Sequence, residues 1–344
     1  MMHVPADVLA AFGLQRADVT PITTGLINAT YRLHAGGRRF VLQRLNPIFG
    51  VEVNADILAV TRHLSRKGLA TPELVLTEAG ATHLVDASGR CWRLLTYVDG
   101  HSQTRADGPQ MCAQAGGLLG RFHLALADFE QPFQHQRGSV HDTPYHLRVL
   151  RDALAQHATH PAHADVRALA EAIEQRVESL PDLAGLPPRV VHGDPKISNI
   201  LFDEAGRAVC MVDLDTLARM PLALELGDAL RSWCNGRAED DPESWLSVER
   251  FDAAIAAYAA TGGELLAPEQ AQAVVDAVAL VATELAARFA ADALRECYFA
   301  WDAERFGAAW QHHLVRARAQ LALARSVRQQ RAQLEAGVRR AFAH

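Results

Sequence analysis

Residues Val190 to Asp203 read VVHGDPKISNILFD, and the segment Asp213-Leu214-Asp215 begins ten residues after this run ends. Two apolar runs, Ile200 to Phe202 and Val209 to Val212, flank the turn-rich segment DEAGR. This pattern is typical of a β-hairpin. Strand pairing would bring the residues before the first strand and those after the second strand to the same end of the hairpin.

Three polar side chains stand at that end of the expected hairpin. Asp194 and Asn199 precede the first strand, and Asp213 follows the second. Their carboxylate and amide oxygens suit Mg²⁺, which keeps substrate phosphates among its ligands. Transfer of a phosphoryl group needs such charge neutralisation and a group that orients the attacking hydroxyl. We therefore predict that Asp194 is the catalytic base and that Asn199 and Asp213 bind the metal, with Asp215 in support.

The spacing also matches a known catalytic pattern. Asn199 follows Asp194 by five residues, as in the H-R-D-x-x-x-x-N loop of protein kinases, with Gly193 in place of the arginine. Taken alone, each aspartate is explained equally well as an exposed turn residue, and His192 as a partner of the backbone. The conjunction of these positions favours phosphoryl transfer.

These motifs resemble the aminoglycoside phosphotransferase family of small-molecule kinases. The central motif is His192-Gly193-Asp194 with Asn199, followed by Asp213-Leu214-Asp215 after the hairpin. Further stretches are similar to the N-acetylhexosamine 1-kinase branch of that family: GLINATY (25–31), FVLQRLN (40–46), VDLDT (212–216), GDALR (227–231), and Arg288-Phe289 with Tyr298-Phe299. The resemblance covers most of the chain.

The resemblance implies an α+β, bilobal protein-kinase-like fold with ATP and Mg²⁺ as cofactors. A β-rich N-terminal lobe, residues 1–98, would bind the nucleotide, and a helical C-terminal lobe, residues 99–344, would carry the catalytic loop and the acceptor site. Strands at 22–33 and 39–45, a helix at 52–67 and three further strands up to Val98 fit the first lobe. Helices at 109–129, 144–157, 164–180, 245–261, 268–289 (continuing towards 297) and 306–341 fit the second.

Within the first lobe, the resemblance places the nucleotide against Thr24, Gly25, Asn28, Leu42, Gln43, Tyr97 and Val98. Thr24 and Gly25 would lie over the phosphates, and the backbone near Tyr97 would hold the adenine edge. Leu42 and Val98 would line the adenine slot, although ordinary core packing explains both equally well.

The strand lysine that grips the phosphates in protein kinases has no counterpart here. Gln43 occupies its place, and the only lysines are Lys67 and Lys196. We predict that Lys196, two residues after Asp194, supplies part of the missing charge, and that its loss slows turnover more than the loss of Gln43. Arg44 would point to the opposite face of the strand.

Residues after the hairpin concern the support of the catalytic loop and the binding of the acceptor. Glu225 departs from the family pattern, in which an Asp braces the catalytic loop, and Asp228 is a possible substitute. Only residues 216–222 separate Asp215 from the next helix, which leaves no room for a regulatory activation loop. The resemblance implies that Arg231 and Arg288 contact the acceptor.

Arg288 shares one helix face with two acids, because Glu284, Arg288 and Asp292 recur every four residues. A solvated row of salt bridges is the plain interpretation of this spacing, and such pairs contribute little to stability. The branch resemblance favours the substrate role for Arg288.

Composition narrows the function classes. The 344 residues suffice for two domains, and a net charge of −6 argues against a nucleic-acid-binding protein. Five scattered cysteines without a C-x-x-C pair predict neither a zinc site nor a disulfide framework. No signal peptide or apolar span is recognisable, so we expect a soluble, cytoplasmic protein without a membrane partner. The sequence indicates no oligomeric state and no preference for ATP over GTP.

The predicted function is ATP- and Mg²⁺-dependent phosphorylation of a hydroxyl on a small molecule, and the branch resemblance implies the anomeric hydroxyl of an N-acetylhexosamine or related sugar. Two alternatives stay open. One is the same chemistry on an aminoglycoside, choline, homoserine or methylthioribose, and an acidic loop at Glu239-Asp240-Asp241 would favour a cationic antibiotic. The other is a nucleotide-binding pseudokinase, against which the intact set of Asp194, Asn199 and Asp213 argues.

Overall fold

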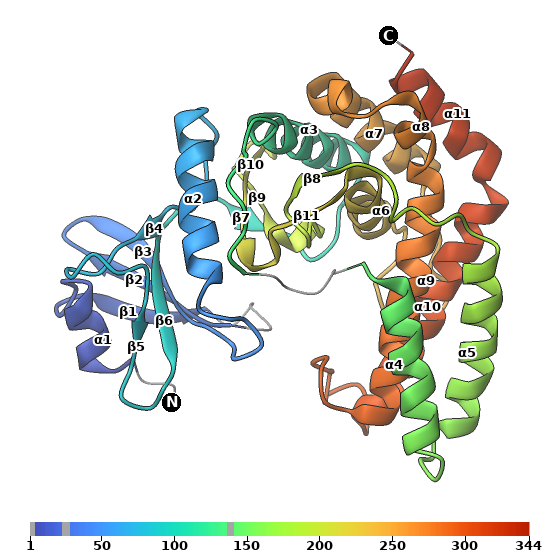
Figure 1. Ribbon diagram of the computed structural model, residues 1–344, viewed down its shortest axis with the longest axis horizontal. Coiled ribbons are helices and arrows are strands. Elements are labelled where there is room, and N and C mark those ends of the chain that lie inside the picture. Colours follow the sequence, from blue (N-terminus) through green and yellow to red (C-terminus); the bar gives the residue numbers. More distant parts are fainter. Residues whose placement is uncertain (1–3, 23–27, 136–140, 344) are drawn as a thin grey trace.

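The computed structural model describes residues 4–22, 28–135 and 141–343. The chain folds into a β-rich N-terminal lobe and a larger helical lobe, on the left and right of Figure 1. This arrangement confirms the expected α+β, kinase-like fold. The expected nucleotide positions Thr24 and Gly25 lie outside the described residues.

A six-stranded antiparallel sheet forms the N-terminal lobe. Its path runs β1-β2-β3-β6-β4, and β5 pairs with β6. The strands are β1 (Asp18–Ile22), β2 (Ala29–Ala35), β3 (Arg38–Arg44), β4 (Leu74–Val75), β5 (Leu84–Val85) and β6 (Cys91–Thr96). Helix α1 (Ala6–Ala11) packs on one face of the sheet and α2 (Val53–Arg66) on the other.

Alternation along the strands decides which side chains reach which face. Leu42 on β3 and Leu94 on β6 are partners in the sheet and pack with α1 in one hydrophobic cluster. The next pair in the same register is Gln43 and Arg93, so these two side chains share the opposite face. Leu42 is therefore a core residue beneath α1, on the opposite face of the sheet from Gln43. The adenine-slot interpretation of Leu42 was wrong. The sequence does not show which face of β3 is covered by α1.

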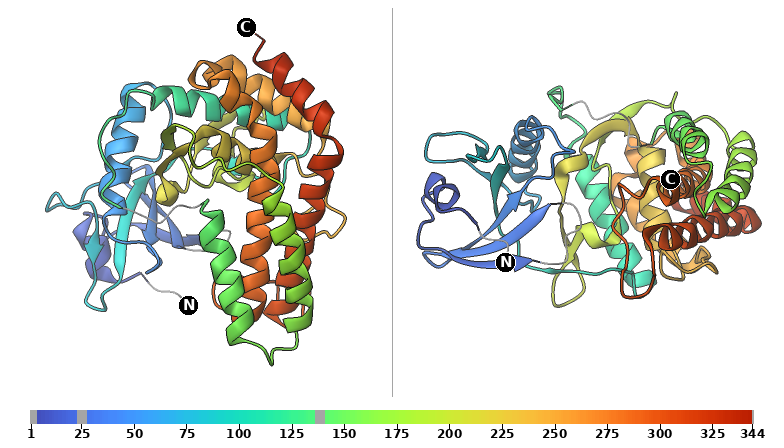
Figure 2. Two further views of the ribbon diagram at one scale, coloured as in Figure 1. Left: turned by 45° about the vertical axis from the view of Figure 1, so that its right-hand side comes forward. Right: turned by 90° about the horizontal axis from the view of Figure 1, so that it is seen from below.

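The helical lobe is built around α9 (Val274–Arg295), which is buried along nearly its whole length. Helices α4, α5, α6 and α10 pack against it, and Figure 2 shows α9 and α10 side by side. The other helices of this lobe and their bounds are α3 (Pro109–Ala125), α4 (Thr143–Gln156), α5 (His163–Glu178), α6 (Leu222–Trp233), α7 (Val248–Gly262), α8 (Pro268–Gln272), α10 (Ala309–Gln329) and α11 (Arg331–Ala341). Across the described ranges, no helix is both long enough and apolar enough to cross a membrane.

Two small sheets carry the segments in which the sequence analysis places the candidate catalytic residues. Strands β7 (His101–Ser102), β9 (Ile200–Phe202) and β10 (Ala208–Met211) form one, and β8 (Pro188–Val191) with β11 (Ala218–Pro221) forms the other. Because β7 pairs with β9, the chain passes from the large sheet to the sheet of the catalytic hairpin between Thr96 and His101. Arg39 on β3 holds this connection, with an ion pair to Asp99 at 2.8 Å and its guanidinium 4.7 Å from the centre of the Tyr97 ring.

Three expected elements are divided in the structure. The helix expected at 268–289 is the two helices α8 and α9. The strand expected at 22–33 is divided between β1 and β2. The helix expected at 306–341 is two helices that meet at Gln330, whose side chain donates to the Leu246 carbonyl at 2.9 Å and to the Ser326 hydroxyl at 2.8 Å. This break directs α11 against α7 and α8. Neither glycine nor proline marks it, so periodicity alone did not reveal it.

Helices α3 and α7 approach closely at a glycine. A Cβ atom on Gly116 would lie 2.2 Å from the carbonyl oxygen of Ala254. A Cβ atom on the adjacent Gly117 would lie at ordinary contact distances, 3.5 Å from the flexible end of Arg121 and 4.0 Å from the carbonyl oxygen of Ala257. Of this glycine pair, Gly116 is the one that close packing requires.

We expect Gly116→Ala to lower the free energy of unfolding by about 1–3 kcal/mol, because the added methyl overpacks a helix contact whose nearest atoms are backbone. Gly117→Ala is the matched control in the same helix, and it should be neutral or stabilising by up to ~1 kcal/mol through helix propensity. Chemical denaturation of the two variants measures the difference, and equal unfolding midpoints would contradict this packing argument.

Candidate active site

The expected hairpin is confirmed. Strands β9 and β10 pair antiparallel, and the Val212 amide donates to the Asn199 carbonyl at 2.9 Å. This hydrogen bond closes the open end of the hairpin, so Asn199 at its entry and Asp213 at its exit become neighbours. The local sequence produces the arrangement, because Asp203 caps the tight turn by accepting from the backbone amides of Ala205 and Arg207.

The catalytic loop is braced by Glu225 of α6. One carboxylate oxygen accepts from the His192 amide at 2.8 Å and the other from the Gly193 amide at 3.0 Å, and the Glu225 side chain is fully buried. Asp228, the expected substitute, pairs instead with Arg231 at 2.6 Å. Glutamate therefore does the bracing that the family pattern assigns to an aspartate.

Gly193 stands where protein kinases have arginine because the backbone leaves no room for a side chain. Its φ is 82°, and a Cβ atom would lie 2.0 Å from the carbonyl oxygen of Thr216. The Thr216 hydroxyl donates to the His192 carbonyl at 2.9 Å. The catalytic loop and the loop that carries Asp213 are thus in direct contact.

Asp194 has one engaged carboxylate oxygen and one available oxygen. Its Oδ2 accepts from the Lys196 ammonium group and, at 3.1 Å, from the Asn199 side-chain amide. Within the described part of the chain nothing bonds to its Oδ1, and the side chain is 26% exposed. An oxygen that is fixed on one side and accessible on the other can accept a proton from an acceptor hydroxyl.

Lys196 keeps its charge in this position. Burial opposes protonation, but the carboxylates of Asp194 and Asp213 outweigh it and raise the pKa of Lys196 above its usual value. A protonated ammonium group therefore contacts the Asp194 carboxylate and is stabilised by the charge of Asp213, which fits the role predicted for Lys196. Its contribution to turnover stays a prediction.

Asn199 and Asp213 fit a hard cation. The Asn199 amide nitrogen is committed to the carbonyl of Asp194 at 2.8 Å, which leaves the amide oxygen as a ligand. Asp213 adopts a left-handed backbone conformation, φ 68°, and burial together with the Asp215 carboxylate raises its pKa to about 6. Bound positive charge would relieve this crowding of carboxylates.

Within the described residues, no cluster of His, Cys, Asp and Glu side chains competes with this pair for a metal ion. Throughout the ranges that the structure describes, no group of three or more His, Cys, Asp or Glu side chains could hold an ion. A site with one amide and one carboxylate suits Mg²⁺, which usually takes one or two carboxylates from the protein and the rest of its ligands from water and phosphates.

Asp215 is engaged by the N-terminal lobe. Its carboxylate pairs with the Arg93 guanidinium and accepts from the Asn28 side-chain amide at 2.7 Å. Gln43, the residue at the strand-lysine position, accepts from Arg93 with its side-chain oxygen at 2.6 Å. Asn28, Gln43 and Asp215 therefore form one network around Arg93, a residue that the sequence analysis missed. A metal role for Asp215 would have to coexist with these bonds.

The remaining expected nucleotide residues lie at the lobe connection. Tyr97 and Val98 are both half-buried, and Tyr97 stacks beneath Arg39. Val41 shares the strand face of Gln43 by alternation and packs towards the core that includes α2. Val41, unlike Leu42, therefore lies on the face of β3 that points away from α1.

Arg231 belongs to an ion-pair cluster, which we call the acceptor-side cluster: Asp228, Arg231, Glu239 and Arg316. Asp228 and Arg231 are buried, whereas the Glu239 side chain is 44% exposed. Arg231 contacts Asp228 at 2.6 Å and Glu239 at 3.7 Å, and Glu239 accepts from Arg316 at 2.6 Å. Burial opposes both charges, yet the pKa of Asp228 is lowered by Arg231, His141 and Lys196, and the pKa of Arg231 is raised by Asp228, Glu239 and Asp194. Asp194 is among the charges that raise the pKa of Arg231, so the cluster interacts electrostatically with the candidate base.

Arg288 lies between two buried acids, so the solvated-row interpretation was wrong. Glu284 accepts from Thr143 at 2.8 Å and from the His141 ring at 3.0 Å, and it is 1% exposed. Asp292 accepts from the backbone amides that follow α9, including Phe299 at 2.8 Å. This loop places the rings of Tyr298 and Phe299 at 5.8 and 5.5 Å from the Arg288 guanidinium.

The acidic loop at 239–241 is neutralised by arginines. Glu239 pairs with Arg316, Asp240 with Arg305 at 2.6 Å, and Asp241 lies 3.9 Å from Arg237. The loop therefore presents no concentration of unpaired negative charge to a cationic antibiotic.

The chain matches the model of the phosphotransferase enzyme family over residues 18–268. This chain belongs to that family. Membership makes it a small-molecule kinase, and hence an enzyme, and it confirms the family-level resemblance drawn from the motifs.

Curated relatives of this phosphotransferase include homoserine kinases. That of Hyphomonas neptunium is 30% identical over 265 residues, which cover 74% of this chain and 76% of that protein. That of Methylobacterium radiotolerans is 25% identical over 267 residues, which cover 74% and 75%. Neither lends support to the N-acetylhexosamine 1-kinase branch, which stays a prediction.

Solved structures share the fold. The microcompartment-associated aminopropanol kinase superposes with a TM-score of 0.65 at 16% identity, over 95% of this chain and 97% of that one. An aminoglycoside phosphotransferase from Alicyclobacillus acidocaldarius gives 0.61 at 18% identity, over 96% and 97%.

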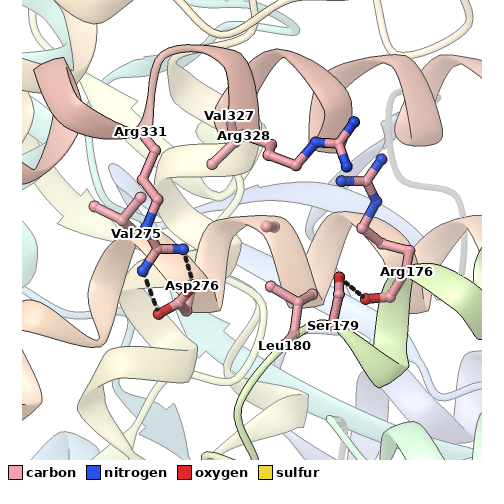
Figure 3. A pocket seen from close by; sticks show the side chains of 9 residues that line it. Arg176, Ser179, Leu180, Val275, Asp276, Val327, Arg328 and Arg331 are labelled. Carbon is pink, nitrogen blue, oxygen red and sulfur yellow. Dashed lines mark hydrogen bonds and ion pairs between the residues drawn. The ribbon is translucent and has the colours of Figure 1, made fainter.

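One cavity of this phosphotransferase lies far from the catalytic loop, between α5, α9 and α10 (Figure 3). Arg176, Asp276, Arg328 and Arg331 are among the residues that line it, and Arg331 pairs with Asp276 at 2.6 Å. It contains none of the residues expected for phosphoryl transfer. The candidate catalytic groups lie instead on the hairpin loops whose Asp215 is bonded by Asn28 and Arg93 of the N-terminal lobe.

We expect Glu225→Gln to lower kcat by roughly ten- to a hundred-fold, because its amide group would leave one buried backbone N–H of the catalytic loop unpaired at a cost of about 1–3 kcal/mol. KM for Mg·ATP should change little. Glu243→Gln is the control, since Glu243 is 83% exposed and its nearest cation is 3.9 Å away. Steady-state kinetics on both variants, with unfolding checked by circular dichroism, tests this role, and normal turnover in Glu225→Gln would exclude it.

Proposed function

We propose that the protein transfers the γ-phosphoryl group of ATP to a hydroxyl of a small molecule, with Mg²⁺ as the metal. The observation that carries the proposal is the closure of the hairpin by Val212 and Asn199, which gathers Asp194, Asn199 and Asp213 at one end. In this proposal residues 1–98 bind the nucleotide, and residues 99–344 supply the catalytic loop and the acceptor site.

The chain's own groups divide the work. Asp194 orients the acceptor hydroxyl and takes its proton through Oδ1, while Lys196 and Asn199 hold the other carboxylate oxygen in place. Asn199 and Asp213 would hold Mg²⁺, which neutralises phosphate charge when bound. The backbone near Tyr97 and the strand face with Val41 and Gln43 would receive the nucleotide.

Asp194→Asn should lower kcat by about 10²–10⁴-fold, the usual contribution of a positioned general base. Mg·ATP affinity should stay within about twofold, because Asp194 acts on the acceptor hydroxyl. A coupled ADP-release assay gives the rate and calorimetry the affinity. Retention of more than about a tenth of the wild-type rate would remove Asp194 from this role; a wild-type protein that binds Mg·ATP but releases no ADP with any acceptor would instead favour a pseudokinase.

For the acceptor we propose an N-acetylhexosamine or related sugar, phosphorylated at its anomeric hydroxyl. The acceptor-side cluster supports this choice, because its paired arginines and acids offer both donors and acceptors to a polyhydroxylated molecule. Tyr298 and Trp301 are 48% and 38% exposed, so they offer aromatic faces on which a sugar ring can stack. A polycation finds no unpaired acidic patch here.

Homoserine is the second candidate. The curated relatives are homoserine kinases, and the Arg231 and Arg288 guanidinium groups offer charge-assisted hydrogen bonds to an amino-acid carboxylate. The two candidates differ in chemistry, since the sugar would be recognised through hydroxyls and an amide, and homoserine through its two charges.

An ADP-release screen across N-acetylglucosamine, N-acetylgalactosamine, other hexoses, homoserine, choline, methylthioribose and aminoglycosides separates these candidates. We expect the highest kcat/KM with one of the two N-acetylhexosamines, and a ³¹P NMR signal coupled to the anomeric proton of the product. Efficient phosphorylation of homoserine without any sugar product would reject the sugar and leave the kinase mechanism standing.

A further inference from the structure

Arg93 is a buried cation next to Gln43, the residue that stands at the position of the strand lysine of protein kinases. It lies on β6 directly opposite Gln43 of β3, and its side chain is 1% exposed. The Gln43 side-chain oxygen accepts from Arg93 Nε at 2.9 Å and from a terminal nitrogen at 2.6 Å. Gln43 therefore orients a buried cation from the neighbouring strand.

The Arg93 guanidinium reaches from the N-terminal sheet to the loop after the catalytic hairpin. It pairs with both carboxylate oxygens of Asp215, with one of the two contacts at 2.9 Å. Asn28 donates to the same carboxylate at 2.7 Å, and its own side-chain oxygen accepts from the Asn46 amide at 2.9 Å. Two separate segments of the N-terminal lobe, through Arg93 and Asn28, thus converge on one carboxylate.

Asp215 sits in the short 3₁₀ turn that immediately follows Asp213. The next residue, Thr216, bonds to the carbonyl of His192 in the catalytic loop at 2.9 Å. A continuous path of contacts therefore runs from Gln43 through Arg93 and Asp215 to the loops that carry Asp213 and Asp194.

Protein kinases order this region with a strand lysine paired to a helix glutamate. Lysine is absent from the N-terminal sheet, because the chain's two lysines are Lys67 and Lys196. The buried acid of α2, Asp56, accepts from the backbone amides of Gln134 and His135, both at 2.8 Å. The lysine–glutamate arrangement has been replaced by one in which the cation lies on β6 and its partner on the metal loop.

We propose that Arg93 is a positioning residue for phosphoryl transfer: by gripping Asp215 it fixes Asp213, and thereby aligns the metal-bound nucleotide with Asp194. This proposal rests on the proposed function, in which Asp213 binds the metal. A direct phosphate contact is the lesser role for Arg93, because four of its five N–H donors are already directed at Gln43 and Asp215.

The decisive variant is Arg93→Lys, which keeps one buried charge but loses the planar fork that grips both oxygens of Asp215. We expect the free Mg²⁺ needed for half-maximal rate and the Kd for Mg·ADP to rise by about ten-fold or more, and kcat to fall by about ten-fold, the effect of losing one charge-assisted hydrogen bond. The acceptor KM and the affinity for metal-free ADP should stay within about twofold. Arg90→Lys is the matched control, since Arg90 lies in the turn before β6, is partly exposed and pairs with Asp86 at 2.9 Å.

Arg93→Met removes the charge altogether and should show larger changes in the same constants; if it does not fold, Arg93→Lys carries the test. If Arg93→Lys needs the same free Mg²⁺ concentration as the wild type, the proposal is overturned. This includes the case in which the variant merely contains less active protein, because such a loss marks a purely structural role for Arg93. An equal loss of affinity for metal-free ADP also overturns it, because Arg93 would then be a phosphate ligand.

Asp213→Ala separates failure of this proposal from failure of the proposed function. If Asp213→Ala weakens Mg·ADP binding while Arg93→Lys does not, only the role of Arg93 is lost. If Asp213→Ala leaves Mg·ADP binding unchanged, the metal is held elsewhere and the proposed site itself fails.

Discussion

The buried ion pair between Asp215 and Arg93 is the constraint on which the junction of the two lobes depends. A carboxylate removed from water is unfavourable by several kcal/mol unless a cation and hydrogen-bond donors surround it. Arg93 and Asn28 supply both, and each comes from the N-terminal lobe. The sheet therefore cannot move far from the catalytic hairpin without leaving a buried charge uncompensated, so electrostatics as well as shape fixes the position of one lobe on the other.

A second buried acid holds the same region from the opposite side. Glu225 pairs with two backbone amides of the catalytic loop, which would otherwise be buried without partners. Asp215 ties the loop that carries Asp213 to the N-terminal sheet, whereas Glu225 ties the catalytic loop to α6. The candidate catalytic groups lie between these two anchors, and this explains how Asp213 can keep a left-handed backbone beside a glycine that has no space for a side chain.

The sequence was sufficient where the determining signal is local. The alternating apolar runs around DEAGR specified the hairpin, and its closure follows from strand pairing. It was insufficient where the partner lies far along the chain. Arg93 acquires its role only when β6 pairs with β3 and aligns it with Gln43, fifty residues away. For the same reason Leu42 was assigned to the cleft although the sheet directs it towards α1. Glu225 was interpreted as a departure from the family's aspartate. Its suitability depends on the distance between α6 and the catalytic loop, across which its two oxygens accept from two successive backbone amides.

The N-terminal sheet, which lacks the strand lysine, and the acceptor-side cluster have one feature in common. In both, an arginine paired with a carboxylate stands in place of an isolated positive charge. Arg93 is held by Asp215, Arg231 by Asp228, and Arg316 by Glu239. Such pairs are already ordered before a ligand arrives, so binding does not have to immobilise long flexible side chains. They also leave little net charge, so discrimination among acceptors rests on the placement of individual donors and acceptors. In the proposed acceptor site, those placements are set by the segment between α6 and α7 and by the loop after α9, which are the parts of such a fold that can vary while the catalytic hairpin stays the same.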